Sequence, residues 1–404
     1  MRTLLGLLGS AYALIAVGWS VPVYSTQPEL TQQQDRARTP QKQNSRSQES
    51  KLAQASQLNE QAFELYKQGK YSQAITLAQK ALAIRQQVLG AEHPDVAQSL
   101  NNLAQLYRSQ GRYSQAEPLF LQALEINKKL LGAEHLDVAI SNINLAALYR
   151  EQGKYEQAEP LFLQALEINK KLLGAEHPYV ATSLSNLAGL YYSQGRYSQA
   201  EPLFLQALEI NKKLLGAEHP DVATSLNNLA GLYFSQGKYS DAEPLYLQAL
   251  EMKKKLLGAE HPSVATSLNN LAGLYELQGR YDEAEPLYLQ ALEMRKKLLG
   301  AEHPDVATSL NNLAGLYFSQ GRHDEAEPLY LQALEMTKKL LGAEHPSVAT
   351  SLNNLAGLYS EQGRYDEAEP LFLQALEMSR KLLGEEHPQT RNISDNLEAL
   401  LKQR

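Results

Sequence analysis

The sequence predicts an all-α protein built from stacked helix pairs, and two observations carry this prediction. The stretch from Gly216 to Leu257 returns every 42 residues in nearly the same form, and apolar residues recur within it at three- and four-residue steps. The other copies begin at Gly90, Gly132, Gly174, Gly258, Gly300 and Gly342. That apolar spacing is typical of an amphipathic helix. A unit of this size buries its apolar face only against its neighbours, so we expect function on a surface shared by many units.

The first helix of the unit, the A helix, is expected to begin at Pro220, where a missing N–H costs little. Asp221 suits the positive end of the helix dipole. Gly237 stands where a left-handed residue ends a helix. The predicted apolar stripe comprises Val222, Leu226, Leu229, Ala230 and Tyr233.

The second helix, the B helix, is expected to follow the turn at Lys238 and Tyr239. Ser240 with Glu243 three residues later has the pattern of a capping box. Its inward face is predicted to include Ala242, Leu245, Tyr246, Ala249 and Leu250. Gly258 closes the helix and starts the next unit.

These units resemble the tetratricopeptide repeat. Its large and small positions match Leu226, Leu229, Ala230, Tyr233, Gly237, Tyr239, Ala242, Tyr246 and Ala249. The 42-residue length and the strings HPDVATSLNNLAGLY and AEPLYLQALE are similar to the kinesin light chain subclass of that family. The resemblance covers roughly residues 52–401. It implies a right-handed superhelical solenoid whose A helices line a concave groove for peptides or partner proteins, and it does not imply a kinesin partner.

The N-terminal segment, residues 1–25, predicts a secretory signal peptide. Arg2 is its only charge, the run from Leu4 to Val17 is almost entirely apolar, and Val23 and Ser25 suit a cleavage site. The alternative is an uncleaved anchor, because the apolar run is just long enough to cross a bilayer. We therefore expect an exported protein, periplasmic, in the cell envelope or extracellular, with membrane contact only if the segment is retained.

Residues 26–50 are rich in Gln and Ser and predict a disordered linker. Residues 51–404 predict the solenoid, with eight helix pairs and a C-terminal capping helix. The net charge of −7 disfavours nucleic acid as a partner. The chain has no cysteine, so disulfides and thiol chemistry are excluded.

One histidine per unit forms a row that invites a metal or proton-relay interpretation. The row comprises His93, His135, His177, His219, His261, His303, His345 and His387. Neighbouring units lie about 10 Å apart per helix layer, too far for two of these side chains to share one ion. We expect each to be the residue before the A helix, held extended by the proline that follows in every unit but one. No catalytic triad, phosphate loop or paired carboxylates appear, so no enzyme, small-molecule substrate, metal or cofactor is expected.

Asparagines on the A helices are the predicted partner-binding residues. They are Asn102, Asn144, Asn186, Asn228, Asn270, Asn312 and Asn354. An amide both donates and accepts, so a row of amides pointing into the groove suits an extended peptide backbone. The resemblance points to the same position. The alternative is that these side chains only keep the groove hydrated. A glycine at one interior position of five A helices, Gly231 among them, indicates either room for a ligand or close helix packing.

One further groove position varies between units and would give specificity. It holds Arg108, Arg150, Tyr192, Phe234 and Phe318, with Glu276 and Ser360 interrupting. We expect a ligand with acidic residues at one end and apolar or aromatic residues further along. The predicted function is a non-enzymatic scaffold for peptide segments of an unidentified partner protein. A self-assembling structural protein or a membrane-anchored adaptor of the cell envelope are the alternatives.

Overall fold

The computed structural model describes residues 40–403, and all regular structure in that range is helical, in seventeen helices. The A helices are α2 (Pro40–Lys67), α4 (Pro94–Ser109), α6 (Leu136–Glu151), α8 (Pro178–Ser193), α10 (Pro220–Ser235), α12 (Pro262–Leu277), α14 (Pro304–Ser319) and α16 (Pro346–Glu361). Each is followed by a B helix: α3 (Tyr71–Leu89), α5 (Tyr113–Leu131), α7 (Tyr155–Leu173), α9 (Tyr197–Leu215), α11 (Tyr239–Leu257), α13 (Tyr281–Leu299), α15 (His323–Leu341) and α17 (Tyr365–Leu383). A last A-type helix, α18 (Pro388–Gln403), has no B helix after it.

The start of α2 differs from the expectation for this part of the chain. Residues 40–50 of the expected linker are helical, and the side chains at 47–50 are exposed. This stretch contains good helix formers, and extending an existing helix adds one hydrogen bond per residue. The predicted signal peptide, residues 1–25, lies outside the described residues. Among the described helices, none is both long and apolar enough to span a membrane.

The apolar stripes predicted from the sequence form the core. Val222 and Leu226 of α10 and Ala249 of α11 are at most 1% exposed, and the counterparts of Val222 and Ala249 in the pairs from α4 to α17 are 0% exposed. Each helix pair packs on the next, so the core runs along the array instead of closing within a unit. This arrangement confirms the predicted solenoid.

The capping-box prediction for the B helices is wrong. Helix α11 begins at Tyr239, and its N-cap residue Lys238 makes no side-chain cap hydrogen bond. Glu243 therefore lies in the second turn, where it is free to reach the next unit, and its Oε2 lies 2.9 Å from Nη1 of Arg280. The glutamate at this position links neighbouring units instead of capping a helix.

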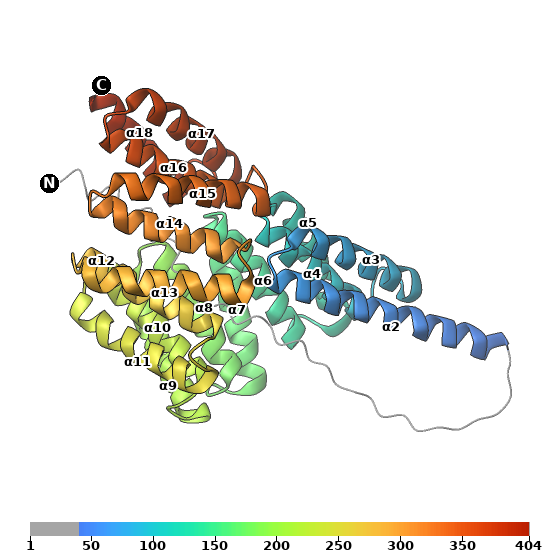
Figure 1. Cartoon of the computed structure of the whole chain (residues 1–404). Helices are drawn as coiled ribbons and strands as arrows, with labels where there is room; N and C mark the ends of the chain where they lie inside the picture. The colour runs from blue at the N-terminus through green and yellow to red at the C-terminus, as the bar shows by residue number, and fades with distance from the viewer. Residues whose placement is uncertain (1–39, 404) are drawn as a thin grey trace.

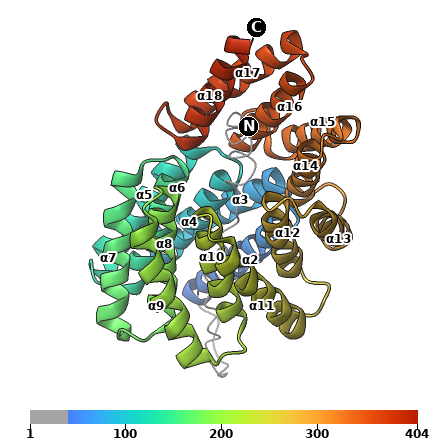
Figure 2. The same ribbon diagram turned by 90° about the vertical axis from the view of Figure 1, so that its left-hand side faces the viewer.

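The array winds through one superhelical turn and then meets itself. Figures 1 and 2 show α16 to α18 next to the segment that holds α5 and α6. At this contact, which we call the seam, Nε2 of His303 lies 3.3 Å from the carbonyl oxygen of Lys67, 236 residues away in sequence. The two further pairs, in which the histidine bonds to a backbone group, are His345 with Ser109 and His387 with Glu151. One superhelical turn thus takes about six helix pairs, from α2 to α13, and α14 begins the next turn.

Candidate partner-binding cavity

The A helices surround one cavity of about 1920 Å³ along the axis of the superhelix. All nine A-type helices, from α2 to α18, contribute lining residues, whereas the B helices contribute only a few, such as Asn127 and Arg295. The groove predicted from the sequence is therefore present, and residues from both sides of the seam, such as Tyr113 and His345, line it.

Asparagine side chains on neighbouring A helices hydrogen bond to one another in the second half of the array. Nδ2 of Asn270 donates to Oδ1 of Asn227 at 3.1 Å, and the bond joins residues 43 apart, one more than the repeat length. The same bond recurs from Asn312 to Asn269 (2.9 Å), from Asn354 to Asn311 (3.2 Å) and from Asn396 to Asn353 (2.9 Å). We call these four bonds the amide ladder. Three predicted binding residues thus use their NH₂ groups to hold adjacent A helices together, which differs from the expected row of freely presented amides.

The ladder does not extend into the first half of the array. At the position of Asn227, the third and fourth A helices carry Ile143 and Ser185, which offer no amide acceptor to the next helix. Four buried amide oxygens in this half have no hydrogen-bond partner within the described residues. They are Oδ1 of Asn59, Asn101 and Asn142, and Oε1 of Gln152. A buried acceptor without a donor costs about 1 to 3 kcal/mol, so these atoms favour any ligand or water that supplies an N–H or O–H group.

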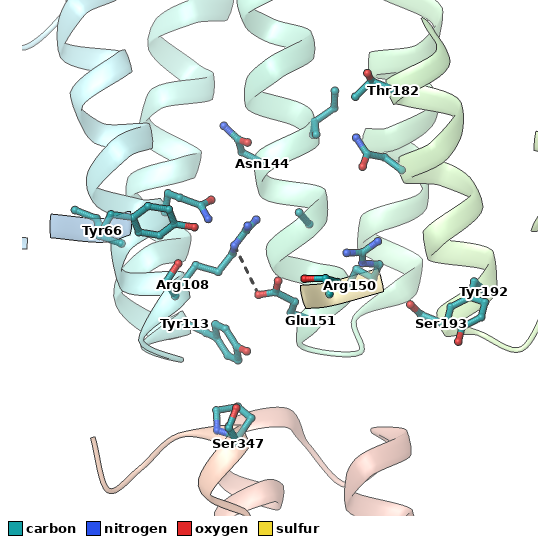
Figure 3. A pocket seen from close by; sticks show the side chains of 18 of the residues that line it. Tyr66, Arg108, Tyr113, Asn144, Arg150, Glu151, Thr182, Tyr192, Ser193 and Ser347 are labelled. Atoms are coloured by element: carbon teal, nitrogen blue, oxygen red, sulfur yellow. Dashed lines mark ion pairs between the residues drawn. The ribbon is translucent and has the colours of Figure 1, made fainter. Parts of the chain in front are cut away.

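Two arginines of the variable groove position lie close together at the carboxyl ends of α4 and α6 (Figure 3). Arg108 and Arg150 are 8% and 9% exposed, and both line the cavity. Nε of Arg108 lies 3.7 Å from Oε2 of Glu151. Burial lowers the pKa of Arg150, and the nearby Arg108 lowers it further while Glu151 raises it. Two guanidinium groups with one carboxylate leave this part of the wall with net positive charge, which attracts an acidic side chain.

Gly189 on α8 packs against Arg150, one of these two arginines. A Cβ atom at Gly189 would lie 2.7 Å from Nη1 of Arg150, closer than side chains pack. Of the two explanations for the glycine row, Gly189 supports close packing between neighbouring A helices, because Arg150 of α6 takes the space beside it.

The aromatic members of the variable position are divided between the cavity and the helix packing. Tyr192 and Phe234 line the cavity, and the hydroxyl of Tyr192 lies 2.7 Å from Oγ of Ser235. Phe318 does not line it and stacks on His323 instead. Of the predicted binding residues, the cavity brings together Asn102, Asn144, Asn186, Asn270, Arg108, Arg150, Tyr192 and Phe234. It does not include Asn228, Asn312, Asn354 or Phe318.

The histidine row has the predicted structural role. In each unit the histidine is the extended N-cap residue of the A helix, and its Nδ1 accepts the backbone N–H two residues later, as from Asp221 to His219 at 3.2 Å. The sequence did not predict the seam, in which three of these histidines bond to backbone groups of the adjacent superhelical turn. Within residues 40–403, no three His, Cys, Asp or Glu side chains are grouped closely enough to hold a metal ion.

Sequence reasoning also missed a polar position near the end of each B helix. In seven of the eight B helices a buried side chain there bonds to a serine or threonine of the following A helix, as Nδ2 of Asn169 does to Oγ of Ser183 at 2.9 Å. In α15 the hydroxyl of Thr337 donates to the carbonyl oxygen of Ala333 in its own helix instead. The row comprises Arg85, Asn127, Asn169, Asn211, Lys253, Arg295 and Ser379. The sequence pattern that could have revealed this position is a polar residue that recurs on the apolar face of the B helices, because a buried polar group needs a hydrogen-bond partner.

Comparison with known proteins supports the fold. A family model described as tetratricopeptide repeat matches residues 53–129, 137–213, 179–255, 221–297, 263–339, 305–381 and 347–404. No curated protein sequence matches the chain. Similar solved structures include nearly identical TPR-like repeats of a protein described as a putative kinesin light chain of Podosopora anserina, 33% identical over 51% of this chain and 98% of its own, with a TM-score of 0.42. BtubC (BKLC) from P. vanneervenii is 27% identical over 58% of this chain and 92% of its own, with a TM-score of 0.45. A Rap protein complexed with Competence and Sporulation Factor is 16% identical over 87% of this chain and 98% of its own, with a TM-score of 0.51.

Proposed function

This chain belongs to the tetratricopeptide repeat family, and from that premise we propose that it is a non-enzymatic scaffold that binds an extended peptide segment of a partner protein in its central cavity. The observation that carries the proposal is the cavity itself, about 1920 Å³ in volume and lined by every A helix. Members of this family bind protein partners through their repeat arrays.

The first half of the array, from α2 to α9, holds the groups best suited to a peptide. An extended peptide presents a backbone N–H at every second residue to one side, and the amide oxygens of Asn59 and Asn101 lie on A helices that line the cavity and lack donors. Arg108 and Arg150 add a positive region at the carboxyl ends of α4 and α6, and Tyr192 adds an aromatic surface on α8. These features favour a segment with an acidic residue followed by apolar or aromatic ones.

The proposal is tested with an array of synthetic peptides that combine acidic and aromatic residues, probed with the full chain. We expect bound sequences to lose at least tenfold in affinity when Arg108→Gln and Arg150→Gln are combined, because both guanidinium groups face the cavity. The matched control is Lys213→Gln, which removes an exposed cation paired with Glu176 on the outside of the array. Far-UV circular dichroism checks that all variants remain helical. Equal binding by the arginine and lysine variants would contradict the proposed site.

We also propose that the protein acts outside the cytoplasm. The support is the sequence of residues 1–25, with Arg2 ahead of the apolar run from Leu4 to Val17. Intact mass measurement of the chain from its native envelope fraction tests this: loss of residues 1–25 indicates a cleaved signal peptide. A full-length mass in the membrane fraction would favour the anchored adaptor instead.

A further inference from the structure

The contact at the seam has two halves, and both halves recur along the rest of the array without contacting each other. One half is the turn between an A helix and its B helix, which contains a glycine. The other half is the histidine that precedes an A helix, together with its proline. We call the unused turns at Gly195, Gly237, Gly279, Gly321 and Gly363 the turn edge. We call the unused histidines His93, His135, His177, His219 and His261 the histidine edge.

The geometry of the seam shows what each half contributes. Nδ1 of His345 accepts the backbone N–H of Ser347 at 3.0 Å, so the neutral ring carries its proton on Nε2 and donates it to the backbone carbonyl of Ser109. Gly111 lies against this histidine: a Cβ atom there would be 2.7 Å from Cδ2 of His345 and 2.8 Å from Cδ of Pro346. The turn therefore supplies a carbonyl and a surface without a side chain, and the histidine supplies an N–H and a flat ring.

The same two halves are present and uncovered elsewhere. The five glycines of the turn edge have the same left-handed backbone, with φ between 70° and 73°, yet a Cβ atom at any of them would meet none of the described residues within 4 Å. On the histidine edge, His219 keeps the same Nδ1 bond to its helix, and its side chain is 36% exposed, whereas His303 in the seam is 7% exposed. Apart from their coverage, the edges match the two sides of the seam.

We propose that a second copy of this chain docks its histidine edge on the turn edge of the first, and so continues the contact that the seam makes within one molecule. The two edges lie on opposite ends of the superhelical turn, so the contact is heterologous, with different surfaces on the two partners. Each added copy leaves one edge of each kind free. Such a contact does not close and produces stacked chains of copies.

Two variants block one edge each and leave the monomer intact. Combining Gly195→Asn, Gly279→Asn and Gly321→Asn places side chains on the turn edge, at positions outside the cavity lining. Asparagine tolerates the left-handed backbone, and the added atoms have open space in the monomer. Combining His177→Asn, His219→Asn and His261→Asn removes the ring Nε2 from the histidine edge, and asparagine retains the ability to cap a helix.

Sedimentation velocity of the purified chain over a range of concentrations tests the proposal. We expect the weight-average sedimentation coefficient of the unmodified chain to rise steadily with concentration, and each edge variant alone to remain at the monomer value. An equimolar mixture of the two variants is expected to form a dimer and to stop there, because each supplies the one edge that the other lacks. His345→Asn, which changes only the seam, is the matched control and should still associate. A monomer at all concentrations, or association that both edge variants retain, would overturn the proposal.

Discussion

The two halves of the array have almost the same sequence but differ in how their A helices are joined. From α10 to α18 the amide ladder is continuous, and each A helix donates to the one before it. From α2 to α9 the described residues form no such ladder, four amide oxygens of Asn59, Asn101, Asn142 and Gln152 lack donors, and two arginines are packed into the wall. The comparison indicates that copying a repeat builds the scaffold, and that a few departures from the copy make one half chemically distinct.

The largest departure is on α6. Asn142 occupies the core position that leucine holds in the neighbouring A helices, it is fully buried, and Ile143 occupies the asparagine position beside it. On α4 the same two positions hold Leu100 and Asn101, so the polar and the apolar residue stand in the reverse order on α6. The strongest prediction reverses this exchange.

Combining Asn142→Leu with Ile143→Asn should raise the free energy of unfolding by about 3 kcal/mol, because it buries an apolar side chain and removes an unpartnered amide oxygen. This gain outweighs the loss of the hydrogen bond that Nδ2 of Asn142 donates to Oε1 of Gln164 at 3.0 Å. It also supplies an acceptor 43 residues before Asn186, where the ladder lacks one. Urea denaturation measures the change, and hydrogen exchange localises it to α6 and α8. The mirror variant in the second half, Leu310→Asn, should lose stability by a similar or larger amount. A less stable double variant would show that Asn142 makes a needed contact.

A smaller effect is expected from the buried lysine of the second half. Lys253 is 6% exposed, its Nζ donates to Oγ of Ser267 at 3.0 Å, and burial lowers its pKa to about 8. In α5, α7 and α9 the same position holds Asn127, Asn169 and Asn211, which make this bond without a charge. Lys253→Asn should therefore raise the free energy of unfolding by about 2 kcal/mol at pH 7.

The sign of its pH dependence follows from the lowered pKa. The unfolded lysine keeps its proton up to its ordinary pKa near 10.5, whereas the folded one releases it near 8, so stability rises with pH between these values. The free-energy cost of burying the charged lysine is present in full below pH 8 and disappears above about pH 10.5. The advantage of Lys253→Asn should thus shrink between pH 7 and pH 10 in thermal unfolding. An advantage that is constant with pH would show that charge burial is not its source.

The smallest effect comes from single ladder residues. Asn312→Ala should cost about 1 kcal/mol, because it leaves the Oδ1 atom of Asn269 without its donor. Asn186→Ala should change stability little, because the residue 43 positions before it is Ile143. Urea denaturation of the two variants compares them directly. Equal losses would mean that the ladder contributes nothing beyond helix packing.

The sequence predicted the parts of the structure that depend on local spacing. The start of α10 at Pro220, the apolar stripe from Val222 and the capping role of His219 follow from residues within one turn of each other. The capping box failed because the backbone begins α11 at Tyr239, two residues earlier than Ser240 and Glu243 required. For the candidate site, the sequence predicted that the A helices line the groove, and the predicted residues Arg108 and Arg150 lie in the cavity wall.

The amide ladder and the seam were not predictable in the same way. Whether Asn270 points along the wall or into the cavity depends on the rotation between adjacent A helices, which no residue pattern states. The seam depends on that rotation summed over six helix pairs, so a small error per unit would separate His303 from Lys67. Only the structure fixes such accumulated geometry.

The seam changes how this array should come apart. In a simple solenoid each module touches only its neighbours, and unravelling starts at either end and spreads one module at a time. Here the first module is fastened to the seventh through Lys67 and His303. Loosening of one terminus is thereby coupled to the other, and the protein gains a long-range cooperativity that linear stacking alone does not give.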